Sequence, residues 1–360
     1  MRPTKAHISL AALRSNAALA QRLAPHSKLV AVVKANAYGH GAVRCAQALS
    51  ELANIFAVAC IDEALELRSA GISKPILLLE GHFGVQELAL SEQHDFWLML
   101  HSEAQVQQLS DYSAKSTFNA WLKVDTGMHR LGLDIEKASA AHTLLSACRH
   151  VKQPVVIATH FASADSEDSD STQKQIAMLN SFNADKNAPI SLSNSAGILA
   201  HNSAHGDWIR PGIMLYGSSP LEYPHRDASA LHAVMSLHSE VIALRTIAQG
   251  ECVGYAGSWC AHRASRIATI AVGYGDGYPR SAPSGTPVLV NGQTAQLCGR
   301  VSMDMITVDV TDCEEIEIGS SVELWGEKLS VNTVAGHAGT IGYELLTRMP
   351  GRVPLLYTDD

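Results

Sequence analysis

Short apolar runs recur through the first two thirds of the chain, and helix-like segments separate most of them. The runs lie near residues 30–33, 55–59, 75–80, 95–100, 117–125, 155–161, 190–194 and 208–215. The helix-like segments have apolar residues spaced by about one helical turn and lie at residues 10–23, 42–52, 61–70, 102–109, 135–148 and 172–182. Strands that alternate with helices form a parallel sheet with right-handed crossovers. Eight such units within about 220 residues predict a TIM-type (β/α)8 barrel rather than an open doubly wound sheet.

The pattern changes after about residue 228, where helical spacing becomes rare until the end of the chain. Strands are predicted at residues 236–247, 266–272, 287–290, 294–297, 305–310 and 322–325. Asn291-Gly292, between two of these runs, is typical of a hairpin turn. The sequence therefore predicts an α/β chain with two domains, a (β/α)8 barrel over residues 1–228 and a mainly β domain over residues 229–360.

Composition and charge narrow the class of protein. With 360 residues, 46% of them hydrophobic and 17% charged, the chain has the composition of a globular protein with an ample core. Its net charge of −8, without a long Lys/Arg run, argues against nucleic acid as a partner. No apolar run approaches the ~18 residues of a membrane span, and the N-terminus lacks a signal-peptide pattern, so we expect a cytoplasmic protein.

Cysteine and histidine spacing adds two further expectations. The seven cysteines include no Cys-x-x-Cys pair, which favours reduced cytosolic thiols over a disulfide framework or a zinc site. The seventeen histidines include no His-Glu-x-x-His pattern, so no metal site is predicted.

A lysine stands at the end of the first predicted barrel strand. The apolar residues 29–33 fit a strand buried on both faces, and Lys34 follows them directly, ahead of turn residues. Lys34 could simply extend its amine outward from the strand end. Alternatively, it is desolvated enough to act as an amine nucleophile that forms a Schiff base with a carbonyl.

Other polar residues follow the later strands, and catalytic groups of (β/α)8 barrels come from these strand ends. Taken singly, most have an ordinary role, because Ser195 fits a helix N-cap and His160 fits a hydrogen-bonded core histidine. Arg130 fits a surface charge. Arg210 is harder to explain in this way, since a buried guanidinium needs a partner.

The combination of these residues points to an anion site opposite the lysine. The loops after strands seven and eight hold phosphate in many such barrels. Ser195 and the backbone amides around Gly212 and Ile213 could supply neutral donors there. A phosphate held opposite Lys34 suggests a phosphorylated aldehyde cofactor, pyridoxal phosphate, joined to that lysine as an imine.

At this point a family resemblance becomes specific. Residues 32–41, Val-Val-Lys-Ala-Asn-Ala-Tyr-Gly-His-Gly, resemble the cofactor-lysine signature of the bacterial alanine racemases, which are pyridoxal-phosphate enzymes of fold type III. Matching stretches follow in the same order at residues 124–132, 159–165, 193–197, 210–217, 254–255, 273–278, 299–305 and 341–344. The resemblance covers essentially the whole chain.

The resemblance implies an isomerase that interconverts L-alanine and D-alanine and supplies D-alanine for peptidoglycan in the cell wall. It implies a two-base mechanism through an external aldimine of pyridoxal phosphate, with Lys34 and Tyr255 as the catalytic bases. The cofactor-binding residues it implies are Lys34, Tyr38, Arg130, His160, Asn194, Ser195, Arg210, Gly212, Ile213 and Tyr343.

The resemblance also implies how the substrate is held and reached. Arg130 and Met303 would bind the substrate carboxylate, and Lys123 is a candidate for carbamylation. The residues implied in an entrance corridor are Asp165, Tyr274, Arg280, Arg300 and Asp304. The site would be completed across a homodimer, so that Tyr255, Met303 and Tyr274 come from the partner subunit.

Three alternatives remain open at the level of sequence. A related enzyme on the same scaffold would be a decarboxylase or a broader-specificity racemase for alanine and serine; Tyr255 and Met303 speak against the decarboxylase. A pyridoxal-phosphate carrier without catalysis would resemble only the barrel half. A barrel without cofactor would show no visible absorbance after purification.

Overall fold

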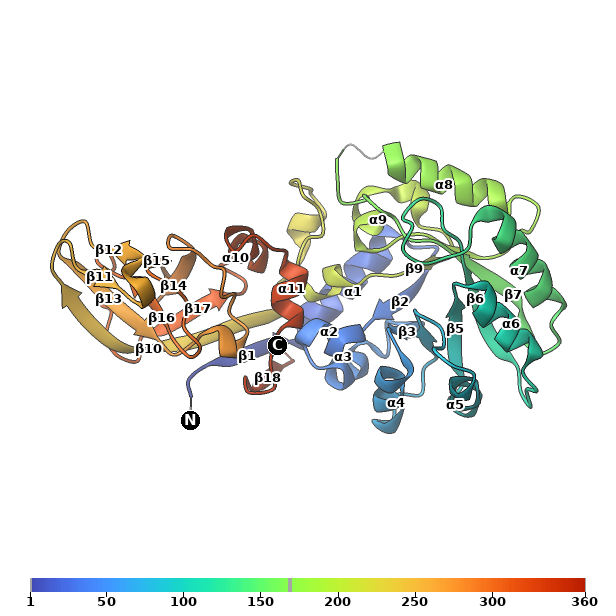
Figure 1. The fold of residues 1–360 in the computed structure, drawn as a ribbon, viewed down its shortest axis with the longest axis horizontal. Helices are drawn as coiled ribbons and strands as arrows, with labels where there is room; N and C mark the ends of the chain where they lie inside the picture. The colour runs from blue at the N-terminus through green and yellow to red at the C-terminus, as the bar shows by residue number, and fades with distance from the viewer. Residues whose placement is uncertain (1, 168–169, 360) are drawn as a thin grey trace.

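The computed structural model describes residues 2–167 and 170–359. It is elongated, with a barrel of strands and surrounding helices in one half and a mainly β domain in the other (Figure 1). The two termini lie near the β domain and near the junction of the two halves. The candidate site residues are therefore divided between the two halves of the molecule.

The barrel consists of eight parallel strands, as predicted. They are β2 (Lys28–Val32), β3 (Ile55–Val58), β4 (Ile76–Leu78), β5 (Phe96–Leu100), β6 (Phe118–Lys123), β7 (Val151–Ala158), β8 (Ile190–Ser191) and β9 (Trp208–Ile209). Their order is β8-β7-β6-β5-β4-β3-β2-β9, so the last strand pairs with the first. Two hydrogen bonds join the remaining edges, from the Asp207 N–H to the Ile190 carbonyl at 2.9 Å and from the Arg210 N–H to the Ser193 carbonyl at 3.0 Å. The prediction of a (β/α)8 barrel is confirmed.

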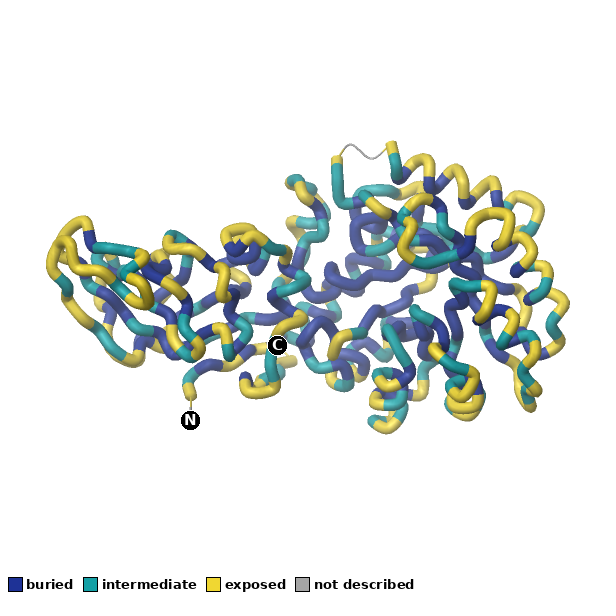
Figure 2. The backbone as a smooth tube through the Cα atoms, viewed as in Figure 1, coloured by how far each residue is buried: buried dark blue, intermediate teal, exposed yellow. Residues whose placement is uncertain are grey.

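Helices cover the outside of the barrel. They are α1 (Leu10–Leu23), α3 (Ala42–Leu49), α4 (Ile61–Ser69), α5 (Gln86–His94), α6 (Glu103–Asp111), α7 (Ile135–Ala147), α8 (Asp170–Asn183) and α9 (Ser195–Ala200). The first helix begins where the sequence indicates, because the Ser9 hydroxyl accepts a hydrogen bond from the Ala12 N–H at 3.1 Å. Its buried residues Leu10, Leu13 and Ala17 recur at helical spacing and face the core. Figure 2 shows the resulting buried centre beneath exposed outer helices.

The second sheet also has eight strands, and one of them comes from the start of the chain. Its strands are β1 (Lys5–Ser9), β10 (Met235–Ile247), β13 (Ser265–Ile270), β14 (Pro287–Val290), β15 (Gln293–Leu297), β16 (Ile306–Asp309), β17 (Ser321–Trp325) and β18 (Leu355–Thr358). The long strand β10 pairs with β1, β13 and β17, which curls the sheet back on itself. The mainly β second domain is confirmed. The exact division at residue 228 stays a prediction, and β1 was not expected from the sequence.

The predicted hairpin at Asn291-Gly292 is present. Strands β14 and β15 pair antiparallel on either side of it. Both turn residues have positive φ, 48° at Asn291 and 77° at Gly292. Asn and Gly tolerate this left-handed region better than other residues, which explains the signal in the sequence.

The expectation of reduced cysteines is wrong for two of the seven. Cys252 and Cys260 form a disulfide across a small separate hairpin, β11 (Cys252–Val253) and β12 (Trp259–Cys260). Because the two cysteines are eight positions apart and meet only through strand pairing, a search for Cys-x-x-Cys misses them. The other five are free thiols.

Before its last strand, β18, the chain returns to the barrel. Helix α10 (Val331–His337) and helix α11 (Gly342–Thr347) lie between β17 and β18 in the sequence, and α11 packs against the turn α2 (Lys34–Gly39). This contact brings Tyr343 within a ring-centroid distance of 6.2 Å of Tyr38. Within the described residues, no helix combines the length and apolar character needed to cross a membrane.

Candidate active site

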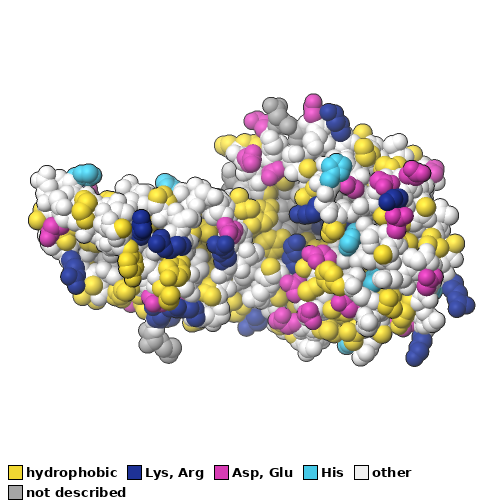
Figure 3. All heavy atoms as spheres, in the orientation of Figure 1, with side chains coloured by type: hydrophobic (Ala, Val, Ile, Leu, Met, Phe, Trp, Pro, Cys, Tyr) yellow, Lys and Arg dark blue, Asp and Glu magenta, His cyan; other side chains and the backbone are white. Residues whose placement is uncertain are grey.

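A cavity of about 680 Å³ lies at the carboxyl ends of the barrel strands. It is lined by residues of several strand ends and by α11, among them every residue that the sequence implicated in cofactor binding: Lys34, Tyr38, Arg130, His160, Asn194, Ser195, Arg210, Gly212, Ile213 and Tyr343. Lys123 lines it as well. We call these eleven residues the barrel group. Figure 3 shows a hollow where the two halves of the molecule meet, with apolar and basic side chains around it.

An unusual backbone turn positions the lysine. Lys34 opens α2, and the next four residues, 35 to 38, all have φ between 51° and 53°. Left-handed residues with a Cβ cost about 1–2 kcal/mol each, so the surroundings must hold this turn in place. The Glu63 carboxylate accepts the Ala35 N–H at 2.7 Å, and the Asn36 side-chain oxygen accepts the Ala42 N–H at 2.8 Å. Strain that is held in this way is typical of functional sites.

The surroundings of Lys34 make its amine easier to deprotonate than that of a free lysine. Burial lowers the pKa of the Lys34 amine, the Glu80 carboxylate opposes this shift, and the Arg130 guanidinium adds to it. Lysines become nucleophiles and bases when their pKa falls in this way. The structure therefore supports the second of the two interpretations of Lys34, a partly desolvated amine facing a cavity.

Arg210 is buried, with 6% of its surface exposed, and its partners are neutral oxygens. Its guanidinium donates to the Ser191 carbonyl at 2.9 Å, the Ser191 hydroxyl at 2.6 Å and the Thr159 carbonyl at 2.7 Å. Burial lowers the pKa of Arg210 to about 10, which still leaves it charged near neutral pH. These acceptors lie at the ends of β8 and β7, the two strands on one side of β9.

Positive charge accumulates around the cavity. Burial, together with Arg210 and Arg130, lowers the pKa of Lys123 to about 8. Burial and the same cations hold the pKa of His160 well below its usual range, so His160 is neutral. Buried cations that lie this close repel one another, and the site as a whole favours an anionic ligand.

A close backbone approach shapes one wall of the cavity. The Ser195 hydroxyl accepts the Gly212 N–H at 2.9 Å, which joins the loops after β8 and β9. A Cβ on Gly212 would lie 2.6 Å from the Tyr38 hydroxyl oxygen, so only glycine fits between them. Asn194 caps α9 by accepting the Gly197 N–H at 3.0 Å. The predicted N-cap at this position is therefore Asn194 rather than Ser195.

A second set of implicated residues lies in the β domain, outside this cavity. Tyr255 and Met303 are exposed, at 68% and 54% of their surface, and Tyr274 and Arg300 are exposed too. The Tyr274 N–H donates to the Ser302 carbonyl at 3.0 Å, next to Met303 in the chain. The turn at Gly254 lies against the backbone of Arg300. A Cβ built on Gly254 would be 3.8 Å from the Arg300 backbone nitrogen. We call Tyr255, Tyr274, Arg300, Met303 and Asp304 the β-domain group.

Two corridor candidates, Asp165 and Arg280, are outside the barrel group and the β-domain group, and Asp304 belongs to the β-domain group. Asp165 is half-buried in the loop after β7, where its carbonyl accepts the Glu222 N–H at 3.1 Å. Arg280 is exposed on the β domain. Asp304 is held by Arg352, whose Nη2 donates to its carboxylate at 2.8 Å. Within one copy of the chain, the hairpin that carries Tyr255 lies at the end of the β domain remote from the barrel (Figure 1).

Comparison with known sequences assigns both halves of the chain. Residues 8–220 match the N-terminal domain of alanine racemase, and residues 234–357 match its C-terminal domain. The chain belongs to the alanine racemase family. It is 51% identical over 356 residues to the alanine racemase of Chromohalobacter salexigens, covering 99% of this chain and 98% of that one.

Solved structures of this family have the same fold along the whole chain. The biosynthetic alanine racemase from Pseudomonas aeruginosa superimposes with a TM-score of 0.96 at 46% identity, covering 99% of this chain and 100% of the other. The alanine racemase from Bartonella henselae, solved with covalently bound pyridoxal phosphate, gives 0.91 at 32% identity, covering 99% and 100%. Alanine racemases use pyridoxal phosphate, and the expected cofactor is thereby confirmed.

The residues present in this chain fit that cofactor. An aldehyde needs an amine with a lowered pKa, which Lys34 provides. A phosphate needs donors that approach closely, which the glycine at position 212 permits beside Tyr38. A cavity of about 680 Å³ also has the usual size for a ligand of this kind.

Two charged residues of the cavity, Glu80 and Glu344, were given no role by the sequence analysis. Glu80 lies two residues after the end of β4 and lines the cavity, and its carboxylate opposes the lowering of the pKa of Lys34 and of Lys123. Glu80 stands at the end of the third predicted apolar run, residues 75–80. A charged residue at the end of a barrel strand is the same sequence signal that identified Lys34.

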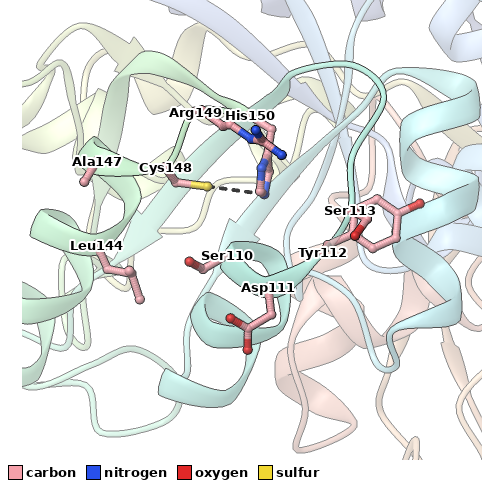
Figure 4. A pocket seen from close by; sticks show the side chains of 9 residues that line it. All are labelled: Ser110, Asp111, Tyr112, Ser113, Leu144, Ala147, Cys148, Arg149 and His150. Atoms are coloured by element: carbon pink, nitrogen blue, oxygen red, sulfur yellow. Dashed lines mark hydrogen bonds between the residues drawn. The ribbon is translucent and has the colours of Figure 1, made fainter.

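A smaller cavity of about 280 Å³ brings Cys148 near His150 (Figure 4). The Cys148 sulfur lies 3.2 Å from His150 Nε2. The same nitrogen lies 2.7 Å from the Leu109 carbonyl, which can only accept a hydrogen bond, so Nε2 carries the proton. It therefore cannot take a proton from the thiol, and this pair is not a nucleophile and base.

Proposed function

We propose that this chain is a cytoplasmic enzyme that racemises alanine with pyridoxal phosphate bound to Lys34. The D-alanine that it forms would be used for the synthesis of peptidoglycan. The observation that carries the proposal is the barrel group, in which a lysine of lowered pKa, a buried arginine and a glycine-lined wall surround one cavity. Membership of the alanine racemase family supports the choice of substrate.

Racemisation removes the α-proton from one face of the substrate and returns a proton to the other. When bound, pyridoxal phosphate stabilises the negative charge that is left on the α-carbon. The protein must add a base on each face. Lys34 would hold or take the proton at Nζ, and the lowering of its pKa by burial makes the neutral amine easier to reach than in a free lysine. Tyr255 would hold or take it at its hydroxyl oxygen on the opposite face.

Tyr255 would come from the partner subunit of a homodimer. Its side chain is 68% exposed and its hairpin is remote from the barrel of its own chain. Met303 and Tyr274 are also exposed in the β domain. Clusters of large apolar side chains on a protein surface often mark a site of contact with another protein. These features support a shared site, in which the β-domain group of one copy completes the barrel group of the other.

The other residues would bind and orient. Arg210 is charged and can only donate, so it would hold the cofactor's ring nitrogen unprotonated. Tyr38, Ser195, Gly212, Ile213 and Tyr343 would hold the phosphate, with His160 and Asn194 behind them. Arg130 and the Met303 backbone N–H would bind the substrate carboxylate.

Lys123 is a candidate for carbamylation. Its pKa of about 8 leaves roughly a tenth of the amine neutral at pH 7. The neutral amine adds to carbon dioxide, gives a carbamate and releases one proton. This change would replace a buried cation by an anion beside Arg130, which removes a repulsion and orients the guanidinium.

A narrow entrance would restrict the substrate to small amino acids. Asp165, Tyr274, Arg280, Arg300 and Asp304 would line the corridor, with Tyr255 and Tyr343 at its inner end. Alanine fits this description, and serine is the nearest competitor.

The proposal is tested by a chiral assay on the purified protein with and without added pyridoxal phosphate. L-alanine and D-alanine should each approach an equal mixture of the two, faster than serine or larger amino acids. An amine product would indicate a decarboxylase. Bound cofactor without inversion of any amino acid would indicate a carrier. Growth of a D-alanine-requiring bacterium that expresses the chain tests the role in peptidoglycan.

A further inference from the structure

We infer that the Cys252–Cys260 disulfide is a positioning element for Tyr255 and makes racemisation sensitive to the thiol redox state. The inference rests on the proposed role of Tyr255 as the second base. The disulfide closes a loop of which Tyr255 is a member, since the two cysteines flank it in the sequence. The disulfide is therefore a covalent cross-link whose loop contains Tyr255.

Besides the disulfide, this hairpin is held by its own strand pairing and by two hydrogen bonds at its base, from the Gly250 N–H to the Ala261 carbonyl at 2.8 Å and from the Ala261 N–H to the Glu251 carbonyl at 2.9 Å. Strands β11 and β12 pair through two residue pairs, Cys252 with Cys260 and Val253 with Trp259, and form a sheet separate from the eight-stranded one. Short two-stranded hairpins are marginally stable by themselves. The disulfide joins the Cys252–Cys260 pair next to these hydrogen bonds, where it limits the separation of the two strands.

The turn inside the loop is under conformational constraint. Gly254, Ala256 and Gly257 all have positive φ, at 74°, 63° and 53°. Ala256 carries a Cβ and therefore pays a cost in this region. A Cβ on Gly257 would lie 3.1 Å from the Cys252 Cβ, so the turn folds directly onto the disulfide. A turn of this kind relaxes when the link that closes it is opened.

The Tyr255 side chain is mostly exposed in the single chain, so packing contacts do little to fix its position. Its position therefore depends on the backbone of the turn. A base has to lie within hydrogen-bond reach of the proton that it transfers, and a displacement of about 1 Å can cost up to 100-fold in rate. Opening the disulfide should therefore slow proton transfer on the Tyr255 face and leave the Lys34 face intact.

The redox step is thiol–disulfide exchange with a small-molecule disulfide. One of the two thiolates attacks that disulfide and releases one small thiol. The second cysteine then attacks the mixed disulfide, which forms the Cys252–Cys260 bond and releases a second small thiol. Two electrons pass from the protein to the small molecule, and two protons end on the released thiols. Cys252 is exposed and Cys260 half-buried in the chain, so both can take part.

The test begins with the bond itself. The holoenzyme is equilibrated with oxidised glutathione, denatured and alkylated, and the labelled cysteines are identified by mass spectrometry. Cys252 and Cys260 should resist labelling until a phosphine reductant is added. Labelling of both without reductant would overturn the inference.

The functional measurement compares the oxidised holoenzyme, the reduced holoenzyme and the double variant Cys252→Ser/Cys260→Ser. The reduced enzyme and the double variant should have a kcat about ten-fold lower. In D2O, exchange of the α-hydrogen should fall for one enantiomer and persist for the other. A general loss of structure would lower both. Oxidised glutathione should restore the reduced enzyme and leave the double variant unchanged.

A matched control is Cys313→Ser, which removes a free, partly exposed thiol of the same domain and should keep the full response to reductant. Tyr255→Phe serves as the reference. If Tyr255→Phe loses exchange on one face while the opened hairpin keeps both, the inference is overturned and the proposed function stands. If Tyr255→Phe keeps exchange on both faces, the role of Tyr255 and the inference fail together.

Discussion

The barrel group and the β-domain group differ in burial and in what holds them. Arg210 and Lys123 of the barrel group are 6% and 8% exposed, and hydrogen bonds from neighbouring strand ends fix Arg210. Tyr255 and Met303 of the β-domain group are more than half exposed. One copy of the chain therefore contains a formed cavity and, outside it, a separate exposed set of residues on the β domain.

This difference separates two tasks. The buried half provides the electrostatics, because burial is what shifts the pKa of Lys34, Lys123 and His160. In the proposed shared site, the exposed half provides groups that act only when a second copy is present. Variants of the first half should therefore damage the chemistry within one chain, whereas variants of the second should be repairable by another chain.

The largest effect is expected for Lys34→Ala. Loss of the amine removes both the cofactor attachment and one base, so racemisation should fall by at least about 10⁴-fold, with loss of the visible absorbance of bound cofactor. The measurement is a chiral assay together with an absorbance spectrum. Lys28→Ala, at the opposite end of the same strand, is the matched control and should remain active. A Lys34→Ala protein that kept the absorbance would contradict the assignment.

The next effect tests whether Tyr255 of one subunit acts in the site of the other subunit. Tyr255→Phe should lower racemisation by about 10³-fold while cofactor binding survives. Mixed with Lys34→Ala and allowed to exchange subunits, it should regain about a quarter of the wild-type activity, because each mixed dimer contains one intact site. If Tyr255 served its own barrel, every site in the mixture would carry a defect and no activity would return.

The sequence predicted the buried half better than the exposed one. The apolar runs gave the strands, and the strand-end rule placed Lys34, Lys123 and Arg210 around one cavity, because parallel strands end on one side of a barrel. Two features depended on tertiary structure. The left-handed turn at residues 35–38 requires Glu63, which is distant in the sequence, and the Cys252–Cys260 bond requires a strand pairing. Tyr255 was found through a family resemblance, since a lone exposed tyrosine has no periodic signal.

A smaller effect is expected from the buried charge on Lys123. Its pKa is about 8 in the folded protein and near 10.5 when unfolded, so the unfolded chain binds more protons between these values. The stability of the wild type should therefore rise with pH from about 8 to 10.5, by at most about 3 kcal/mol. Below pH 8, Lys123→Met should have the higher Tm, and the difference should shrink as the pH rises.

The comparison is made by thermal unfolding in buffer free of carbon dioxide, at one saturating cofactor concentration. Lys152→Met, which changes an exposed lysine on β7, is the control and should show no such trend. Added bicarbonate should abolish the trend if it converts Lys123 to a carbamate. A constant difference in Tm across this pH range, without bicarbonate, would show that Lys123 is not a destabilising buried cation.

The smallest effect is expected at the wall of the cavity. In Gly212→Ala the new methyl group would lie 2.6 Å from the Tyr38 hydroxyl, and Tyr38 is buried and stacked on Tyr216 at 4.8 Å, so it has little room to move. The dissociation constant of pyridoxal phosphate should rise about ten-fold, or ~1.4 kcal/mol. Gly336→Ala, where a methyl group meets nothing within 4 Å, should bind normally. Tyr38→Phe removes the clashing oxygen, with the next ring atom at 3.3 Å, but also the hydroxyl proposed to hold the phosphate, so Gly212→Ala/Tyr38→Phe should bind about as tightly as Tyr38→Phe alone. Equal affinity for Gly212→Ala and wild type would mean that this wall yields, and that the barrel group is less rigid than its burial implies.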